Sequence, residues 1–233
     1  MKYRRLLLKL SGEALAGGKG SGIDPAIVAS MADAIVRTHQ LGADISIVIG
    51  AGNIVRGISM SAQGFGRVTG DQMGMLGTVI NCLALQDALI ERGVDARVLS
   101  GVEIGFCEKF SQKSVERHLS KRRILLLAGG TGNPFFTTDT AAALRALEVG
   151  ADLLIKATKV DGIYDADPVK VPTAQKFETL TLARAVELDL KVMDAAALAL
   201  CRDNKMPILV CQMEGDNLSK AVRGEKIGTL VTP

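Results

Sequence analysis

The chain is poor in aromatic residues and histidine. Aromatic residues make up 3% of its 233 residues, tryptophan is absent and only two histidines occur. So few rings argue against a nucleic-acid surface built on base stacking. The six prolines, and 25 glycines without a collagen-like period, argue against a fibrous or disordered chain. With 48% hydrophobic and 23% charged residues, the composition is that of a globular protein with a sizeable core.

Charge and cysteine content exclude further classes. The net charge of +3 is too small to indicate DNA or membrane binding, but it suits small phosphorylated ligands where basic residues converge. The four cysteines form no Cys-x-x-Cys pair, so we expect no zinc site, and free thiols in a cytoplasmic protein. The N-terminal apolar run is broken by Lys9, which favours a buried strand over a signal peptide. No run reaches the roughly 18 apolar residues of a membrane-spanning helix.

Short apolar runs alternate with helical periods along the chain. Strands are predicted at residues 5–10, 45–49, 96–99, 124–128, 153–157, 208–211 and 229–232. Helices are predicted at residues 24–42, 71–91, 111–120, 138–148, 181–188, 194–204 and 216–223, with residues 158–178 irregular. In the long helix we expect Leu76, Ile80 and Leu83 to face the core.

Continuous apolar strands separated by helices indicate a parallel sheet covered on both faces. The predicted fold is therefore α/β: a three-layer αβα sandwich with a mainly parallel central sheet. We expect residues 1–233 to form a single domain, with at most a weak subdivision near residue 150.

Three predicted strands run into glycine turns. These are Ser11-Gly12, Gly50-Ala51-Gly52 and Gly129-Gly130-Thr131-Gly132. Ligands of parallel sheets bind beyond the carboxyl ends of the strands, and glycine turns there expose N–H groups to anions. One such turn is commonly only structural. Three on one edge indicate phosphate binding.

Familiar nucleotide and hydrolase motifs are missing. The sequence has no Walker A motif, no protein-kinase HRD or DFG motif, no GxGxxG after the first strand and no GxSxG. Isolated cations remain: Lys9 ends the first strand, Arg56 follows the second glycine turn, and Lys156 and Lys159 accompany the strand at 153–157. Each alone is commonly a surface charge, but together they would neutralise a triphosphate and a moving phosphoryl group.

On these residues the chain resembles the bacterial UMP kinases of the amino acid kinase family. The matching strings are KLSGEAL at 9–15, GIDP at 22–25, VIGAGNIVRG at 48–57, GDQMGML at 70–76, AGGTGNPFFTTDTAA at 128–142, LIKATKVDGIYDADP at 154–168 and LKVMDAAALAL at 190–200. The resemblance covers nearly the whole chain, and the segments TGNPFFTTD and KATKVDGIY…ADP separate UMP kinases from acetylglutamate, carbamate and aspartate kinases. The resemblance implies ATP-dependent phosphorylation of UMP to UDP in pyrimidine nucleotide biosynthesis. It also implies Mg²⁺ arriving with ATP, a homohexamer, activation by GTP and inhibition by UTP.

The resemblance assigns roles to individual residues. The expected catalytic residues are Lys9, Arg56, Asp139 and Lys159. The expected ATP-binding residues are Lys9, Leu10, Ser11, Gly12, Gly52, Arg56, Thr158, Tyr164 and Asp167. The expected UMP-binding residues are Ala51, Asp71, Thr131, Gly132, Asn133, Pro134, Phe135, Phe136, Thr137 and Thr138. The loop expected to take part in GTP activation is Gly17, Gly18, Lys19, Gly20, Ser21 and Gly22. No protein metal ligand is expected, because phosphates and water hold the magnesium ion.

Ordinary structural interpretations stand beside several of these roles. Asp194 matches another aspartate of the family's nucleotide site. A helix N-terminus is an equally ordinary place for this residue, and also for Asp71 and Asp139. Phe135-Phe136 would suit a core, and the loop at 17–22 could be merely flexible. Ala51 stands where the family has glycine, and it fits there only with a negative φ.

Two other functions are weighed against a UMP kinase. One is a non-catalytic nucleotide-binding or storage module on the same fold, against which the retained Lys9, Arg56, Asp71 and Asp139 argue. The other is an acetylglutamate-type kinase, against which the TGNPFFTTD segment argues.

Overall fold

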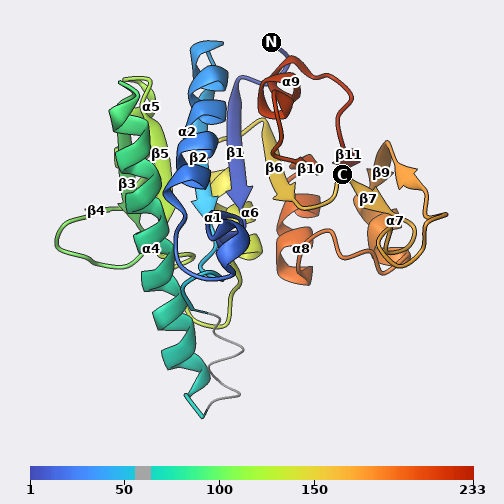
Figure 1. Ribbon diagram of the computed structural model, residues 1–233, viewed down its shortest axis with the longest axis horizontal. Helices are drawn as coiled ribbons and strands as arrows, with labels where there is room; N and C mark the ends of the chain where they lie inside the picture. Colours follow the sequence, from blue (N-terminus) through green and yellow to red (C-terminus); the bar gives the residue numbers. More distant parts are fainter. Residues whose placement is uncertain (56–63) are drawn as a thin grey trace.

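The computed structural model describes residues 1–55 and 64–233, which build a central sheet with helices on both faces (Figure 1). Within the described residues this sheet has nine strands in the order β4-β3-β5-β2-β1-β6-β10-β11-β9. Their bounds are β1 Arg5–Leu10, β2 Asp44–Ile49, β3 Ala96–Ser100, β4 Glu108–Lys109, β5 Ile124–Ala128, β6 Leu153–Thr158, β9 Thr179–Thr181, β10 Ile208–Gln212 and β11 Thr229–Thr232. The β10–β11 pairing is antiparallel, and the other pairings of this sheet among the described residues are parallel. A separate antiparallel pair joins β7 (Ile163–Tyr164) to β8 (Lys176–Phe177). The predicted αβα sandwich with a mainly parallel sheet is confirmed.

The two faces of the sheet bury different helices. One core packs α1 (Gly12–Leu15), α2 (Pro25–Gln40), α4 (Arg67–Glu91) and α9 (Asn217–Arg223) on the sheet. The other packs α5 (Gln112–Leu119), α6 (Thr138–Glu148), α7 (Leu182–Glu187) and α8 (Ala195–Asp203). Because side chains alternate along a strand, Leu6, Leu8 and Leu10 of β1 enter the first core and Leu7 enters the second.

The predicted elements lie close to the observed ones. The longer strands match to within a residue at each end, and α2 begins as expected, with Pro25 in its first turn and the Asp24 carboxylate accepting from the Ala26 N–H at 3.0 Å. The long helix α4 begins at Arg67, four residues before the predicted start. The short strands β4, β7, β8 and β9 were not predicted, since two or three residues carry no periodicity.

The predicted inward face of α4 is wrong for Leu76 and Ile80, whereas Leu83 packs partly buried against the first core as predicted. Leu76 and Ile80 are 53% and 46% exposed, while Met75, Val79 and Cys82, one position before or two after them, are buried. The helix is apolar around most of its circumference, so the hydrophobic pattern does not fix which side meets the sheet. Among the described residues, α4 is also the one helix whose length and composition would allow it to cross a membrane, yet half of its most apolar window is buried inside the fold. That burial is typical of a core helix.

Candidate functional site

The glycine turns meet at the carboxyl ends of the central strands. The Gly50 N–H donates to the Leu10 carbonyl oxygen at 2.9 Å, which joins the turn after β2 to the turn after β1. A Cβ at Gly12 would collide with the carbonyl oxygen of Gly50 and lie 2.5 Å from Asn53 Oδ1. Only glycine therefore fits at residue 12, and the two turns form one continuous backbone surface.

A carboxylate between two lysines lies at this edge. Lys9 Nζ is 2.7 Å from Asp139 Oδ1, and Lys156 Nζ is 2.7 Å from Asp139 Oδ2. Lys156 also donates to the Val192 carbonyl oxygen at 2.6 Å. Lys9 and Lys156 are direct neighbours on the paired strands β1 and β6, which sets both ammonium groups on the same side of the sheet. We call Lys9, Asp139 and Lys156 the lysine–aspartate cluster.

The electrostatics of this cluster favour an anionic ligand. Burial alone would raise the pKa of the Asp139 carboxyl, but the charges and hydrogen bonds of Lys9 and Lys156 outweigh burial and hold that pKa below its ordinary value. Asp139 is therefore ionised at neutral pH. Two ammonium groups around one carboxylate leave an excess positive charge at the carboxyl edge of the sheet, where a phosphate would be attracted.

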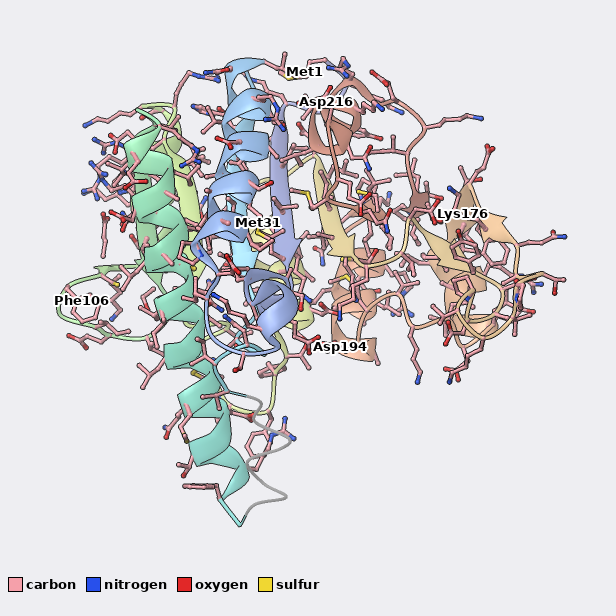
Figure 2. The ribbon with its side chains drawn as sticks, viewed as in Figure 1. Met1, Met31, Phe106, Lys176, Asp194 and Asp216 are labelled. Carbon is pink, nitrogen blue, oxygen red and sulfur yellow. The ribbon has the colours of Figure 1, made fainter. Side chains whose placement is uncertain are left out.

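Helix caps position Asp139. It lies in the first turn of α6, whose N-cap Thr137 accepts from the Asp139 N–H at 3.0 Å. Asp194 caps α8 by accepting from the Ala197 N–H at 2.8 Å, and it also accepts from the hydroxyls of Thr137 and Thr140. Asp194 lies at the lower end of α8 in Figure 2, beside the strand ends. The cap interpretation of Asp194 is confirmed, and this residue ties the starts of α6 and α8 together.

A hollow of about 180 Å³ opens between the second and third glycine turns and α4. Most of the expected UMP-binding residues line it, namely Ala51, Asp71, Thr131, Asn133, Phe136, Thr137 and Thr138. The remaining three, Gly132, Pro134 and Phe135, belong to the same segment but do not line the hollow. We call this space the acceptor hollow.

Asp71 joins α4 to the 131–137 segment across the hollow. Its Oδ2 accepts from the Phe135 N–H at 2.7 Å and from Arg67 Nε at 2.8 Å. Phe135 has φ +73°, which a residue with a side chain rarely adopts, and its ring lies 5.5 Å from the Arg67 guanidinium carbon. Phe135 and Phe136 are 62% and 51% exposed, so the interpretation of these rings as core residues is wrong.

The condition on Ala51 is met. It is not among the residues with positive φ, and its carbonyl oxygen accepts from the N–H groups of Ile54 and Val55 at 2.9 and 2.8 Å. Its side chain is buried. Alanine can therefore occupy this turn without backbone strain.

The expected ATP-binding residues beyond β6 are held by local hydrogen bonds. Thr158 Oγ1 donates to the Val160 carbonyl oxygen at 2.7 Å. Tyr164 Oη donates to Asp161 Oδ1 at 2.5 Å, and this hydrogen bond raises the pKa of Tyr164. Lys176, which Figure 2 shows on the β7–β8 side of the molecule, donates to Asp161 Oδ2 at 2.8 Å. The Tyr164 ring is thus held at its hydroxyl, and the adenine contact remains a prediction.

One expected catalytic cation, Lys159, lies at an exposed position outside the lysine–aspartate cluster. The Lys159 side chain is 86% exposed, and its Nζ lies 3.6 Å from Glu13 Oε2. Arg56 lies outside the described residues. Lys156, and not Lys159, is the second lysine that contacts Asp139. The position of Lys156 within the strand could have been used to predict this contact. Alternation from the buried Leu154 sends residue 156 to the same side of the sheet as Lys9.

The loop expected to respond to GTP is tied to the second glycine turn. The Gly22 N–H donates to the Asn53 carbonyl oxygen at 2.9 Å, and Asn53 Nδ2 donates to the Gly22 carbonyl oxygen at 2.7 Å. Asn53 also exchanges two amide hydrogen bonds with Asn81 of α4, and Asn81 Nδ2 donates to the Gly50 carbonyl oxygen at 2.8 Å. These two buried amides were not predicted, although an asparagine within the apolar stretch of α4 was a signal for Asn81.

No cluster of metal ligands accompanies these groups. The described residues hold no group of three or more His, Cys, Asp or Glu side chains arranged to bind a metal ion. Both Asp139 oxygens are paired with lysines.

Comparison with known proteins agrees with this architecture. A model of the amino acid kinase family matches residues 4–212. The chain belongs to the amino acid kinase family. Within this family it is 53% identical over 233 residues to a uridylate kinase of Xanthomonas oryzae pv. oryzae, covering 99% of this chain and 97% of that relative.

Solved structures of the family show the same fold. A UMP kinase from Bacillus anthracis superposes with a TM-score of 0.96 at 35% identity, covering 100% of this chain and 97% of the other. A UMP kinase from Ureaplasma parvum superposes with a TM-score of 0.93 at 35% identity, covering 100% of both chains. The family resemblance stated from the sequence motifs is confirmed.

Proposed function

We propose that the chain transfers the γ-phosphoryl group of ATP to UMP, forming ADP and UDP, in pyrimidine nucleotide biosynthesis leading to UTP and CTP. The observation that carries this function is the lysine–aspartate cluster beside the acceptor hollow, at the edge where the glycine turns follow the central strands. The names of the similar proteins, uridylate kinase and UMP kinase, support the acceptor.

The catalytic residues act by position and charge. UMP already carries a phosphate anion, so its attack on the γ-phosphorus needs no general base, and catalysis rests on alignment and neutralisation of charge. Lys9, whose ammonium group pairs with Asp139, would stabilise the phosphoryl group in transfer. Asp139 holds Lys9 and Lys156 on opposite oxygens and so fixes the spacing of the two ammonium groups. Arg56 and the exposed Lys159 would complete the charge on the ATP phosphates.

A kinase acting on ATP needs a divalent cation, and we assign Mg²⁺. The absence of a carboxylate cage among the described residues fits an ion that ATP phosphates and water hold. When bound, the ion neutralises phosphate charge. The residues of this chain bind around it: the turn Leu10, Ser11 and Gly12 with Gly52 on the phosphates, and Thr158, Tyr164 and Asp167 on the adenosine.

The acceptor site uses both sides of the hollow. Asp71 would accept hydrogen bonds from the ribose hydroxyls of UMP. Thr138 would hydrogen-bond the uracil, and the N–H of Ala51 would donate to the UMP phosphate. The 131–137 segment shapes the pocket, and Phe135 and Phe136 at its rim would cover the nucleotide.

Assembly and regulation are part of the proposal. We assign a cytoplasmic homohexamer in which residues 1–233 act as a single domain, activated by GTP through the loop at 17–22 and inhibited by UTP. The strands of one sheet come from both halves of the chain, which supports a single domain. The exposed Leu76, Ile80 and Ile90 of α4 support a subunit contact along this helix.

A coupled assay of ADP release tests the activity. With Mg²⁺, ATP and UMP we expect UMP-dependent turnover, with CMP and dUMP poor acceptors. Lys9→Ala is expected to abolish turnover while the melting temperature stays near that of the wild type. Absence of UMP-dependent turnover would reject the proposal, and UMP binding by calorimetry without turnover would favour a storage module.

A further inference from the structure

Arg145 of α6 has its charged head buried outside the acceptor hollow. Its side chain is 6% exposed, which is rare for arginine unless the guanidinium is fully partnered. Nη1 donates to Glu148 Oε2 at 2.6 Å and Nη2 donates to the Gly130 carbonyl oxygen at 3.1 Å. The guanidinium carbon lies 3.8 Å from the centre of the Phe110 ring. The buried guanidinium of Arg145 thus binds one carbonyl oxygen of the third glycine turn.

That turn is closed by its own Gly132 N–H, which donates to the Gly129 carbonyl oxygen at 3.0 Å, and it is held from outside at two further points. Gly129, Gly130 and Gly132 have φ values of +74°, +59° and +81°. Glycine permits these values but does not impose them, because it adopts many other conformations. The Gly129 N–H donates to Thr78 Oγ1 at 2.8 Å, which fixes the start of the turn. The Arg145 hydrogen bond fixes its middle.

Gly101 confines the guanidinium at this place. A Cβ at residue 101 would lie 2.8 Å from Arg145 Nη2 and 3.2 Å from the Gly130 carbonyl oxygen. The planar fork is therefore held between the chain at Gly101 and the glycine turn. A lysine ammonium has no such fork and would not serve Glu148 and Gly130 in the same geometry.

We propose that Arg145 is a positioning residue for the acceptor nucleotide. It holds the Gly130-Thr131 wall of the acceptor hollow through the Gly130 carbonyl oxygen and does not itself line the hollow. The proposal rests on the proposed function, since it takes the hollow as the UMP site. It implies that loss of the fork weakens UMP binding while leaving ATP binding and the phosphoryl-transfer step intact.

Arg145→Lys removes the planar guanidinium but keeps the positive charge, so it tests whether the guanidinium geometry is needed. We expect the KM for UMP to rise about tenfold, the equivalent of one net hydrogen bond, with kcat and the KM for ATP close to wild type. Hydrogen exchange at the Gly132 and Asn133 amides should accelerate, while the β5 amides stay protected. Glu148→Gln is the matched control. It leaves the Gly130 hydrogen bond in place, so it should lower the melting temperature without raising the KM for UMP.

Arg145→Gln is a second variant. Its shorter, neutral side chain loses the fork without adding an atom against the glycine turn, so it should reproduce the rise in the KM for UMP, and it decides the question if Arg145→Lys does not fold. The proposal would be overturned if the folded variants keep the wild-type KM for UMP. It would also be overturned if the KM values for UMP and ATP rise equally and follow the fall in melting temperature, as in Glu148→Gln. If the wild type phosphorylates a different nucleotide, the proposed function fails, and the same comparison is made on the KM of that acceptor.

Discussion

The Cβ of Ala51 faces Gly77 of α4 so closely that a methyl group added at residue 77 would lie 2.8 Å from it. The second glycine turn therefore packs directly on the helix backbone, and one of the two positions must lack a side chain. In an exposed helix, exchange of glycine for alanine stabilises by about 1 kcal/mol. Here we expect Gly77→Ala to destabilise by about 1–3 kcal/mol, because the turn or the helix must shift.

A double-mutant cycle checks this contact. Ala51→Gly removes the opposing Cβ, so the double variant should recover most of the stability that Gly77→Ala loses in urea unfolding. The remaining contact, at 3.4 Å from the Cβ of Ile54, is ordinary. Additive effects of the two substitutions would show that the Ala51 contact is not the cause.

Asp139→Asn should reduce both activity and stability. It leaves Lys9 and Lys156 without their carboxylate, so kcat should fall on the order of 10²-fold. Loss of one partner of a buried ion network costs about 3 kcal/mol in the unfolding free energy. A variant with wild-type kcat would show that the spacing of the two ammonium groups is not needed for transfer.

The same carboxylate predicts an acid-dependent stability. The pKa of Asp139 is lowered in the folded state, so its charge stabilises the fold above the ordinary aspartate pKa of about 3.9. That stabilisation is lost as the pH falls from there through the lower folded-state value. Urea unfolding from pH 7 down to pH 3 should therefore show a steeper loss of stability at the acid end for the wild type than for Asp139→Asn.

Lys156→Ala and Lys159→Ala form a matched pair on one strand end. Lys156 contacts Asp139, so its loss should lower kcat on the order of 10²-fold. Lys159 is exposed, pairs with Glu13 and does not belong to the lysine–aspartate cluster, so its loss should chiefly raise the KM for ATP. Steady-state kinetics with each substrate varied separates the two, and the reverse pattern would exchange their roles.

Asp71→Asn should relax the choice of sugar. The carboxylate is proposed to accept the ribose hydroxyls, and it already holds the Phe135 N–H. We expect kcat/KM for UMP to fall more than that for dUMP, so that their ratio shrinks. Gln72→Ala, on the exposed neighbouring residue, is the control and should leave the ratio unchanged.

Native thiol labelling should be confined to Cys107. Burial raises the pKa of Cys201 and of Cys211 to about 12, and raises that of the fully buried Cys82 further. Cys107 is partly exposed, though burial raises its pKa as well. Iodoacetamide at pH 8 followed by mass spectrometry should find slow modification at this residue alone. Labelling of Cys201 in the native protein would contradict the burial of that thiol.

The sequence predicts best what depends on local pattern. The apolar strands and the turns that follow them are local features, as is the cap at Asp24, and each was found at or near its place. The inward face of α4 could not be predicted, because nearly all of its faces are apolar and tertiary packing decides between them.

The candidate site divides in the same way. The motif residues around the acceptor hollow come from contiguous strings, and the sequence identifies them as a set. Three other residues act through partners that are distant in the sequence. Lys156 pairs with Asp139 at a separation of 17 residues, Asn81 with Asn53 at 28, and Arg145 with Gly130 at 15. Composition and spacing do not encode such pairs, which exist only after strands and helices have packed.

The place of β1 in the sheet has a consequence for how such an enzyme diversifies. β1 lies between β2 and β6, so the acceptor hollow and the expected adenosine contacts fall on opposite sides of it. Lys9 stands on the dividing strand, and the proposed mechanism has it contact the phosphoryl group between the two sites. Changes in the loops and helices from β2 outward should therefore alter the choice of phosphoryl acceptor while leaving the expected adenosine contacts beyond β6 in place.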